Sequence, residues 1–316
     1  MNSQLFTLAQ APPAGALPQA KRSLGQNFLV DPNTIRAVVD CLAAMSGEPV
    51  FEIGPGRGAL TAELLRRGLE LTVLEKDMNL ARHVAAHFPG ARVIVGDALH
   101  FAWEALPPGA RLVGNLPYNV ASPIIWEIVS RLPGATRLVF TVQKEVGQRL
   151  CAQPGNRAYG GLSVWVQTFA AVRYERTLSS TVFRPRPKVD SAVVRMEPHT
   201  HPPDVVAQRQ LARTLRLCFQ KRRKQLGTIL KNVWGPELVE WLGTRGLDRT
   251  VRPEALSPEA FFGYLLGVEM VIAMLVMVPA AKIAEYVGLK PVVALGFAVY
   301  AIFPVVLITA PASATA

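Results

Sequence analysis

The feature that most constrains this chain is a short apolar strand that runs straight into a glycine-rich turn. Residues 49–53 predict the strand, and Gly54, Gly56 and Gly58 alternate directly after it. Glycine adopts backbone conformations that other residues avoid, so such a turn can be tight and lets a ligand approach the main chain. Apolar residues at helical spacing follow at 60–65. This order of strand, turn and helix predicts the first unit of a parallel sheet.

The alternation of strand and helix continues well beyond this unit. Asp31 before Pro32 is typical of a helix start, and apolar residues at helical spacing follow it to Leu42. Strands that alternate with helices at such intervals predict a doubly wound, mostly parallel α/β sheet of the Rossmann-like type. The further predicted strands are residues 71–74, 93–95, 111–113 and 138–142.

Most of the net positive charge of the chain lies between residues 200 and 253. The 316 residues include 34 Lys and Arg against 23 Asp and Glu, a net charge of +11. Between residues 200 and 253 there are 11 Lys and Arg against 4 Asp and Glu, and residues 208–230 predict a basic helix. A basic helix is often only a solvated face, but this density favours binding of nucleic acid. We therefore expect a small helical domain over residues 204–266, with Lys221, Arg222, Arg223 and Lys224 as the RNA-binding candidates.

The last fifty residues have a different character. In residues 267–316 the only charges are Glu269, Lys282, Glu285 and Lys290, which cancel. Residues 291–311 carry no charge, and 261–281 carry only Glu269, which is typical of membrane spans. The loop between these runs weakly resembles one of the major-facilitator transporters. A span at 261–281 would place Lys282 and Lys290 outside, against the usual charge bias, so we interpret this apolar helical tail as a stray fragment; a membrane tether is the alternative.

Other features indicate a chain of the cytoplasm. Residues 1–20, rich in Ala and Pro, predict a disordered leader without the pattern of a signal peptide. Cys41, Cys151 and Cys218 are far apart, which suits a reducing compartment. His83 and His87 are four residues apart on a predicted helix, but no carboxylate motif accompanies them, so we expect no metal site.

Acidic residues end the second and third predicted strands. Glu75 can accept hydrogen bonds from the ribose of a nucleoside cofactor, and Asp97 from an adenine amino group. Glu75 could instead cap a surface turn, and Asp97 a following helix. The glycines follow a G-x-G-x-G order, whereas the dinucleotide fingerprint requires G-x-G-x-x-G. Gly54, Gly56, Glu75 and Asp97 together favour S-adenosyl-L-methionine over a dinucleotide.

The sequence Asn115-Leu116-Pro117-Tyr118 follows the fourth predicted strand. The exocyclic amine of adenine is a weak nucleophile, because its lone pair is delocalised into the ring. The Asn115 amide oxygen and a carbonyl of Leu116 or Pro117 can accept its two N–H bonds and so help to localise that lone pair. Pro117 fixes the backbone, and Tyr118 offers a ring on which an extruded base can stack, worth about 1–3 kcal/mol. A purely structural turn is the alternative.

At this point the chain resembles a known family. Residues 21–266 are similar to the small-subunit ribosomal RNA adenine dimethyltransferases, and seven separate motifs carry the resemblance in order. These motifs are KRSLGQNFLVDPN at 21–33, FEIGPGRGALT at 51–61, GNLPYNVASP at 114–123, QKEVGQRL at 143–150, YGGLSV at 159–164, FRPRPKVDSAVVR at 183–195 and FQKRRKQL at 219–226.

The resemblance implies a class I methyltransferase domain over residues 21–203 and roles for particular residues. Asn27 and Leu29 would contact the cofactor together with Gly54, Glu75, Asp97 and Asn115. The segment from Asn115 to Tyr118 would hold the target base, with Phe183 as a second aromatic wall. The family transfers two methyl groups to each of two adjacent adenosines near the 3′ end of small-subunit ribosomal RNA during ribosome assembly. The partner would be the immature small subunit, and we expect a monomer.

Three other functions are compatible with parts of this pattern. Enzymes that dimethylate large-subunit RNA and confer antibiotic resistance share the fold and the loop, but Leu116 and the stretches AYGGLSV and PKVDSAVVR favour the small-subunit branch. A ribosome-assembly factor without catalysis would not need the intact glycine turn, Glu75, Asp97 and the Asn-Leu-Pro-Tyr loop. A nicotinamide oxidoreductase is disfavoured by the glycine spacing.

Overall fold

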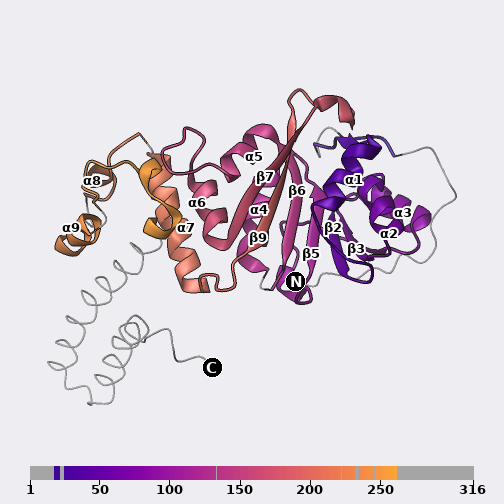
Figure 1. Cartoon of the computed structure of the whole chain (residues 1–316), viewed down its shortest axis with the longest axis horizontal. Coiled ribbons are helices and arrows are strands. Elements are labelled where there is room, and N and C mark those ends of the chain that lie inside the picture. The colour runs from indigo at the N-terminus through magenta and orange to yellow at the C-terminus, as the bar shows by residue number, and fades with distance from the viewer. Residues whose placement is uncertain are drawn as a thin grey trace, which may run out of the picture. The chain divides into compact units, whose positions relative to one another are not determined.

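The computed structural model describes residues 18–21, 25–132, 134–221, 223–231, 235–244 and 246–261 (Figure 1). The chain divides into two compact units, with the division after Gln208. Most of the predicted leader and the whole apolar tail, 267–316, lie outside the described residues. Of the helices that are described, none combines the length and apolar character that a membrane crossing requires.

A seven-stranded sheet forms the first unit, in the order β4-β3-β2-β5-β6-β9-β7. The five strands from β4 to β6 are parallel, whereas β9 pairs antiparallel with both β6 and β7. The predicted Rossmann-like α/β sheet is therefore confirmed. The strands are β2 (Pro49–Ile53), β3 (Glu70–Glu75), β4 (Arg92–Val95), β5 (Arg111–Asn115), β6 (Arg137–Gln143), β7 (Ala170–Leu178) and β9 (Ser191–Pro198).

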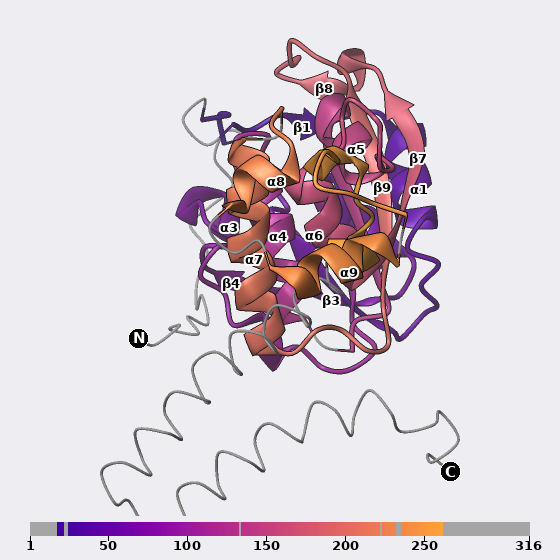
Figure 2. The same ribbon diagram turned by 90° about the vertical axis from the view of Figure 1, so that its left-hand side faces the viewer.

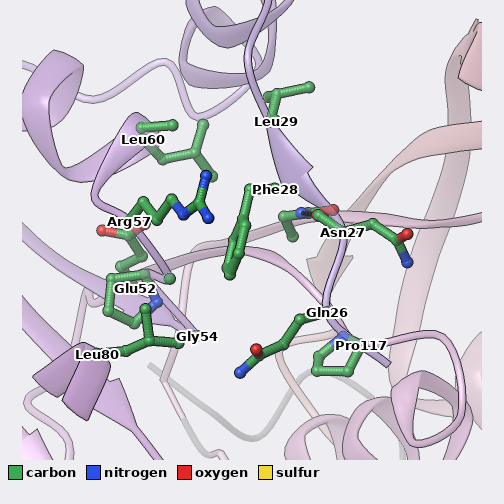
Figure 3. A pocket seen from close by; sticks show the side chains of 14 residues that line it. Gln26, Asn27, Phe28, Leu29, Glu52, Gly54, Arg57, Leu60, Leu80 and Pro117 are labelled. Atoms are coloured by element: carbon green, nitrogen blue, oxygen red, sulfur yellow. Dashed lines mark hydrogen bonds between the residues drawn. The ribbon is translucent and has the colours of Figure 1, made fainter. Parts of the chain in front are cut away.

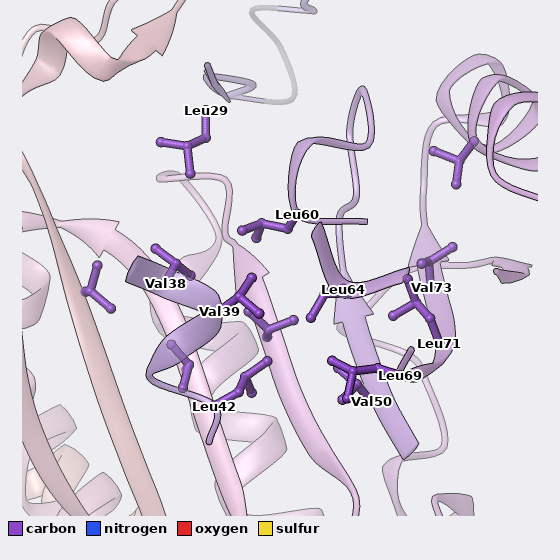
Figure 4. Packing of buried hydrophobic residues seen from close by; sticks show 14 of the residues in the cluster. Leu29, Val38, Val39, Leu42, Val50, Leu60, Leu64, Leu69, Leu71 and Val73 are labelled. Carbon is purple, nitrogen blue, oxygen red and sulfur yellow. The ribbon is translucent and has the colours of Figure 1, made fainter. Parts of the chain in front are cut away.

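Helices cover both faces of this sheet because successive strand residues point to opposite sides. Val50 belongs to a buried cluster with residues of α1 and α2 (Figure 4). The next residue, Phe51, packs against the rings of Phe101 and Trp103. The helices are α1 (Pro32–Asp40), α2 (Ala59–Arg66), α3 (Met78–His87), α4 (Ala121–Arg131), α5 (Lys144–Leu150) and α6 (Gly161–Phe169), with short 3-10 helices η2 (Trp103–Ala105) and η3 (Ser180–Val182).

The start of α1 follows the sequence prediction. The Asp31 carboxylate accepts a hydrogen bond from the Thr34 amide at 2.7 Å, and Pro32 occupies the first helical turn. Val38, Val39 and Leu42 then project toward Leu60 and Leu64 of α2 (Figure 4). This packing fixes α2, and therefore the glycine turn before it, on the sheet.

A second, two-stranded sheet joins distant parts of the first unit. Strand β1 (Phe28–Leu29) pairs antiparallel with β8 (Phe183–Arg184), with Leu29 opposite Phe183 and Phe28 opposite Arg184. Figure 2 shows β1 and β8 side by side. The pairing carries the N-terminal segment to the carboxyl edge of the large sheet, where the predicted cofactor residues lie.

The second unit is helical, but its first helix is shorter than predicted. Helix α7 (Val205–Gln220), which crosses the division, ends ten residues before the predicted end at Leu230, and α8 (Leu226–Ile229) follows after a turn. The reason is tertiary: the amides of Leu226 and Gly227 donate to the carbonyls of Val251 and Arg249, at 2.8 and 2.9 Å, instead of continuing α7. Helix α9 (Pro236–Gly243) and the 3-10 helix η5 (Pro253–Ala255) follow in the described part of this unit.

Candidate active site

A pocket opens at the carboxyl ends of β2 and β5, where ligands bind in open α/β sheets. The N-terminal segment forms one wall, and the glycine turn with the start of α2 forms another. Figure 3 shows the Phe28 ring in the centre of this pocket, between the side chains of Arg57 and Asn27. The lining residues are Gln26, Asn27, Phe28, Leu29, Glu52, Gly54, Pro55, Gly56, Arg57, Ala59, Leu60, Leu80, Asn115 and Pro117.

The glycine turn has the left-handed backbone for which glycine is best suited. The φ angles of Gly54, Gly56 and Gly58 are 66°, 58° and 86°. A Cβ atom on Gly56 would lie 2.8 Å from the Phe28 ring, and one on Gly58 only 2.1 Å from the Phe88 ring. Two of the three glycines are therefore required both by conformation and by close packing.

Below this turn lies Glu52, a buried carboxyl group whose side chain is 1% exposed. The Thr61 hydroxyl donates to Glu52 Oε2 at 2.7 Å. Burial raises the pKa of Glu52 to about 8, although the Thr61 hydrogen bond works against the shift, and the nearby Glu75 adds to it. At pH 7 Glu52 is therefore mostly neutral, and the buried turn has no full charge beneath it.

Glu75, the predicted ribose acceptor, ends β3 and is 6% exposed. Its Oε2 accepts from the Gly56 amide at 3.3 Å and its Oε1 from the Asp77 amide at 2.9 Å. Burial raises its pKa, and these backbone hydrogen bonds limit the shift. The carboxylate thus ties the glycine turn to the start of α3, and each oxygen retains a lone pair for a ribose hydroxyl.

Asp97, the predicted adenine acceptor, already has partners on both oxygens. Lys76 Nζ lies 2.7 Å from Oδ2, and the Leu99 amide donates to Oδ1 at 3.0 Å. Partial burial works against ionisation of Asp97, but these two partners outweigh it and hold the pKa below its ordinary value. The Leu99 contact makes a local turn rather than a helix cap, and Asp97 does not line the pocket.

Asn115 occupies the end of β5 and is paired on only one side. Its Nδ2 donates to the Asn27 carbonyl at 2.6 Å, so the N-terminal segment fixes the amide. Its Oδ1 is buried and has no hydrogen-bond partner among the described residues. Buried acceptors are rarely left unpaired, because each costs free energy comparable to a lost hydrogen bond. The unpaired Oδ1 of Asn115 is therefore available to accept a hydrogen bond from an adenine N–H.

The rest of the Asn-Leu-Pro-Tyr loop is held in place by its neighbours. The Leu116 amide donates to the Thr141 carbonyl at 3.0 Å, and the Pro117 carbonyl accepts from the Val120 amide at 3.1 Å. Because the Pro117 carbonyl already has a donor, the geometry favours Leu116 as the backbone acceptor for a base. The Tyr118 hydroxyl bonds to the Ser191 hydroxyl, and burial raises the pKa of Tyr118.

The structure does not bring Phe183 to the pocket, where the sequence places it as an aromatic wall. Its side chain is 0% exposed and belongs to the buried cluster that contains Leu29 and Val38. The β1–β8 ladder explains this placement, because it turns Phe183 toward the core and leaves the following residue, Arg184, exposed. In this conformation the Phe183 ring offers no surface to a base.

Several lining residues of the pocket were not predicted as site residues, and Arg57, Phe28 and Gln26 are the most informative of them. The Arg57 guanidinium lies 4.7 Å from the centre of the Phe28 ring and donates to the Pro18 carbonyl at 3.0 and 2.8 Å. Gln26 completes this wall. Phe28 and Gln26 stand in the Gly-Gln-Asn-Phe-Leu stretch singled out above, which is a usable signal. Only the β1–β8 pairing, however, places that stretch over the glycine turn.

Comparison with known proteins decides the family. A model of the ribosomal RNA adenine dimethylase family matches residues 18–265. The chain belongs to this family. The predicted resemblance is thereby confirmed, and the match leaves out the apolar tail, whose likeness to a transporter has no support.

Sequence relatives of this dimethylase are 40–49% identical to it over the aligned residues. A ribosomal RNA small subunit methyltransferase A from Nitratidesulfovibrio vulgaris is 49% identical over 251 residues, which cover 77% of this chain and 94% of the relative. One of the same name from Acidithiobacillus ferrooxidans is 40% identical over 256 residues, covering 78% and 94%. The alignments therefore span nearly the whole length of these relatives.

Solved structures agree on the fold of the dimethylase. The 23S rRNA methyltransferase ErmE is 25% identical, with a TM-score of 0.60 over 77% of this chain and all of the other. A dimethyladenosine transferase from Plasmodium falciparum is 23% identical, also with a TM-score of 0.60, over 76% of this chain and 95% of the other. The second match supports the fold alone.

The dimethylase uses S-adenosyl-L-methionine, and the pocket fits this cofactor. The left-handed glycines allow a ligand to approach the backbone. Glu75 is not itself a lining residue, but it accepts from the amide of the lining residue Gly56 and retains a lone pair on each oxygen. The dinucleotide alternative is thereby set aside. Within the described ranges, no group of three or more His, Cys, Asp or Glu side chains could hold a metal ion, and the rings of His83 and His87 simply lie 4.2 Å apart.

The predicted RNA contacts of the dimethylase lie in the second unit, in the turn after α7. Lys221, Arg223 and Lys224 are exposed, and Arg222 lies outside the described residues. The Lys224 amide donates to the Lys221 carbonyl at 2.7 Å, so these cations sit on a turn and not on the helix that the sequence predicts. Their role in RNA binding stays a prediction.

Proposed function

We propose that this chain transfers methyl groups to N6 of two adjacent adenosines near the 3′ end of small-subunit (16S) ribosomal RNA during ribosome assembly in the cytoplasm. The observation that carries the proposal is the buried, unpaired Oδ1 of Asn115 beside the pocket. Relatives that are 40–49% identical and named small subunit methyltransferases support the choice of RNA. We further propose that the enzyme acts as a monomer on the immature small subunit.

The proposed mechanism is positioning. Asn115 Oδ1 accepts one N–H of the target adenine, and the Leu116 carbonyl accepts the other, which turns the nitrogen lone pair toward the pocket. Because Asn115 Nδ2 is held by the Asn27 carbonyl, Oδ1 is oriented before the base arrives. When bound, S-adenosyl-L-methionine supplies an electrophilic methyl group. In-line positioning of the amine matters more than a strong general base, because the nitrogen attacks with its proton still bound and that proton is then lost to water.

The other residues of the site have supporting roles in this proposal. Gly54 and Gly56 let the cofactor lie against the backbone, with Asn27 and Leu29 on the opposite wall. Glu75 accepts hydrogen bonds from the ribose. Asp97 accepts a hydrogen bond from the adenine amino group of the cofactor, on an oxygen that also accepts from Lys76 or Leu99. Tyr118 stacks with the extruded base, its hydroxyl fixed by Ser191. Lys221, Arg222, Arg223 and Lys224 contact the RNA backbone.

Transfer of labelled methyl groups to undermethylated small ribosomal subunits tests the proposal. We expect four methyl groups per subunit, and none on protein-free large-subunit RNA offered under the same conditions. Label on the large-subunit RNA alone would favour the resistance-type function, which the likeness to ErmE keeps as a second candidate. If neither RNA is labelled although the cofactor binds, the chain is a non-catalytic assembly factor.

A further inference from the structure

A cluster of cations spans the end of β8 and the connection to β9, and together these residues 184–190 are called the loop. Arg184, Arg186 and Lys188 occupy alternate positions and are all exposed, with Pro185 and Pro187 between them. Proline fixes the backbone φ angle, so the loop is stiff and its charges have little freedom to withdraw. The first acidic residue after Arg184 is Asp190.

The two arginines are fixed by neutral groups. Arg184 Nη1 donates to the carbonyls of Thr181 and Phe183, at 3.2 and 2.9 Å, and Arg186 Nε donates to the Ser180 hydroxyl at 2.9 Å. The nearby Asp190 carboxylate instead accepts from the Ser180 amide. In the part of the chain that the structure describes, none of the three cations of the loop forms an ion pair, so their charge is oriented but not neutralised.

Three arginines of the large sheet are neutralised by carboxylates, whereas Arg92, Arg173 and Arg176 form no ion pair among the described residues. Arg111 lies 3.1 Å from Glu48, and Arg137 lies 2.8 Å from Glu197. Arg195 contacts Glu175 and Glu197. What distinguishes Arg184 and Arg186 from these arginines is that neutral acceptors hold their guanidinium groups. Unneutralised guanidinium groups held by neutral acceptors are well suited to bind phosphate, which matches their planar donor geometry.

Both ends of the loop are tied to the pocket. At one end, Arg184 pairs in the β1–β8 ladder with Phe28, which lines the pocket (Figure 2). At the other end, Ser191 begins β9 and bonds to the hydroxyl of Tyr118, the predicted stacking residue. The Asp190 carbonyl also accepts from the Lys144 amide at 3.0 Å, which fixes this end to β6 and α5.

We propose that Arg184, Arg186 and Lys188 form a phosphate clamp for the RNA strand on either side of the target adenosine. Extruding a base requires the flanking backbone to be held while the base leaves its stack, and a stiff cationic loop beside Tyr118 supplies that hold. The inference rests on the proposed function for its choice of RNA. It adds a contact surface on the catalytic unit to the cations predicted at 221–224.

Salt-dependent RNA binding tests the clamp. We would measure the affinity of the full chain, with S-adenosylhomocysteine bound, for a single-stranded RNA oligonucleotide that carries two adjacent adenosines. For single strands, each phosphate contact contributes about 0.7 to the slope of log affinity against log salt. The double variant R186Q/K188Q should lower that slope by about 1.4. Between 50 and 200 mM salt its affinity should then fall about seven-fold less than that of the unmodified chain.

The double variant R82Q/R92Q is the matched control. Arg82 on α3 and Arg92 on β4 are exposed, and β4 forms the opposite edge of the sheet from β7. Its slope should equal that of the unmodified chain, whereas the charge-preserving variant R186K/K188R should restore the slope lost in R186Q/K188Q. Cofactor affinity and the melting temperature confirm that each variant is folded.

Several outcomes would overturn the clamp. An unchanged slope in R186Q/K188Q, an equal loss in R82Q/R92Q, or no recovery in R186K/K188R would each contradict it. The readout is binding, not turnover. A failure of methyl transfer in the unmodified chain would therefore break the proposed function and leave the result on the clamp separate.

Discussion

The two sides of the pocket differ in how completely their polar atoms are paired. On the cofactor side, Glu52 accepts from Thr61, and Glu75 accepts from the Gly56 and Asp77 amides. On the base side, Asn115 is held by its Nδ2, but its Oδ1 is buried without a partner among the described residues. The cofactor side is thus complete by itself, whereas the base side has an acceptor that only a substrate satisfies.

This difference indicates separate roles for the cofactor side and the base side of the pocket. Interactions that are complete before substrate arrives stabilise the fold and bind the cofactor, while interactions that form only with the reacting group accelerate the reaction. Variants on the cofactor side should therefore change stability or cofactor affinity. Variants on the base side should change the rate at saturating substrates.

The largest effect is expected for Asn115→Ala. Loss of a preorganised hydrogen-bonding group commonly lowers kcat by about 10²–10³. We expect a loss of this size in methyl transfer, with RNA affinity nearly unchanged and cofactor affinity within about ten-fold, since one contact of this kind is worth at most that much. Asn119→Ala, at an exposed residue of the same loop, is the control and should retain activity. A fall in cofactor affinity as large as the fall in kcat would contradict the proposed difference between the cofactor side and the base side of the pocket.

The next effect concerns the stability of the glycine turn. Gly58→Ala should lower the free energy of unfolding by about 3 kcal/mol, because the left-handed backbone costs about 1–2 kcal/mol and the overlap with Phe88 adds about 1–3. Gly155→Ala is the control: its φ is 83°, but nothing lies within 4 Å of the added carbon. Chemical denaturation should give the smaller loss there, and equal losses would show that Phe88 yields without cost.

Glu52→Gln should remove a dependence of stability on pH. Burial raises the folded pKa from 4.5 to about 8, so the stability contributed by neutral Glu52 is complete below pH 4.5 and is lost as pH rises to about 8. Relative to Glu52→Gln, the unmodified chain should lose about 2–3 kcal/mol of unfolding free energy between pH 5 and 7.

Glu48→Gln provides the control of opposite sign for that measurement. Hydrogen bonds from the Met45 amide and from Arg111 hold the pKa of Glu48 below 4.5. Its contribution to stability is therefore present above pH 4.5 and is lost as pH falls through the lowered pKa. If the two variants gave the same pH dependence, Glu52 would not be neutral in the folded protein.

The smallest effect is expected for Glu75→Gln. The side-chain amide of glutamine would direct its N–H donors toward one of the two backbone amides that now donate to Glu75. It also lacks the negative charge that accepts a hydrogen bond from a ribose hydroxyl. Calorimetry should show the Kd of S-adenosylhomocysteine rising about ten- to hundred-fold, in line with about 1.5–3 kcal/mol for a hydrogen bond to a charged group. At saturating cofactor kcat should be nearly normal. Glu70→Gln, at the exposed start of the same strand, should leave the Kd unchanged; a selective loss of kcat in Glu75→Gln would contradict the comparison.

Local patterns were sufficient for most of the large sheet. The buried runs at 49–53 and 111–113 predicted β2 and β5, and Asp31 with Pro32 predicted the start of α1. These signals lie within a few residues of one another. Strands β7 and β9 escaped the prediction, since they are joined to the sheet by antiparallel pairing over a long connection, and β7 alternates charged and apolar residues as an edge strand does.

The placement of single side chains was harder to predict. Asp97 was expected to be free for adenine, but Lys76, the residue after Glu75, occupies one of its oxygens. Phe183 was expected beside the base and lies in the core. The end of the basic helix was expected at Leu230, but α7 ends at Gln220. In each case the deciding partner is remote in sequence, and no local pattern reports it.

By itself the sequence determined the five parallel strands β2 to β6, the glycine turn, the residues at the strand ends and the family, since each depends on short-range patterns. Tertiary structure alone decided which of those residues are paired. The β1–β8 ladder brings Asn27 to Asn115, places Phe28 against Gly56 and directs Phe183 into the core. The physical reason is that hydrogen bonding and burial depend on which distant segments of the chain come into contact. That contact is stabilised by the packing of the whole first unit and not by any local sequence pattern.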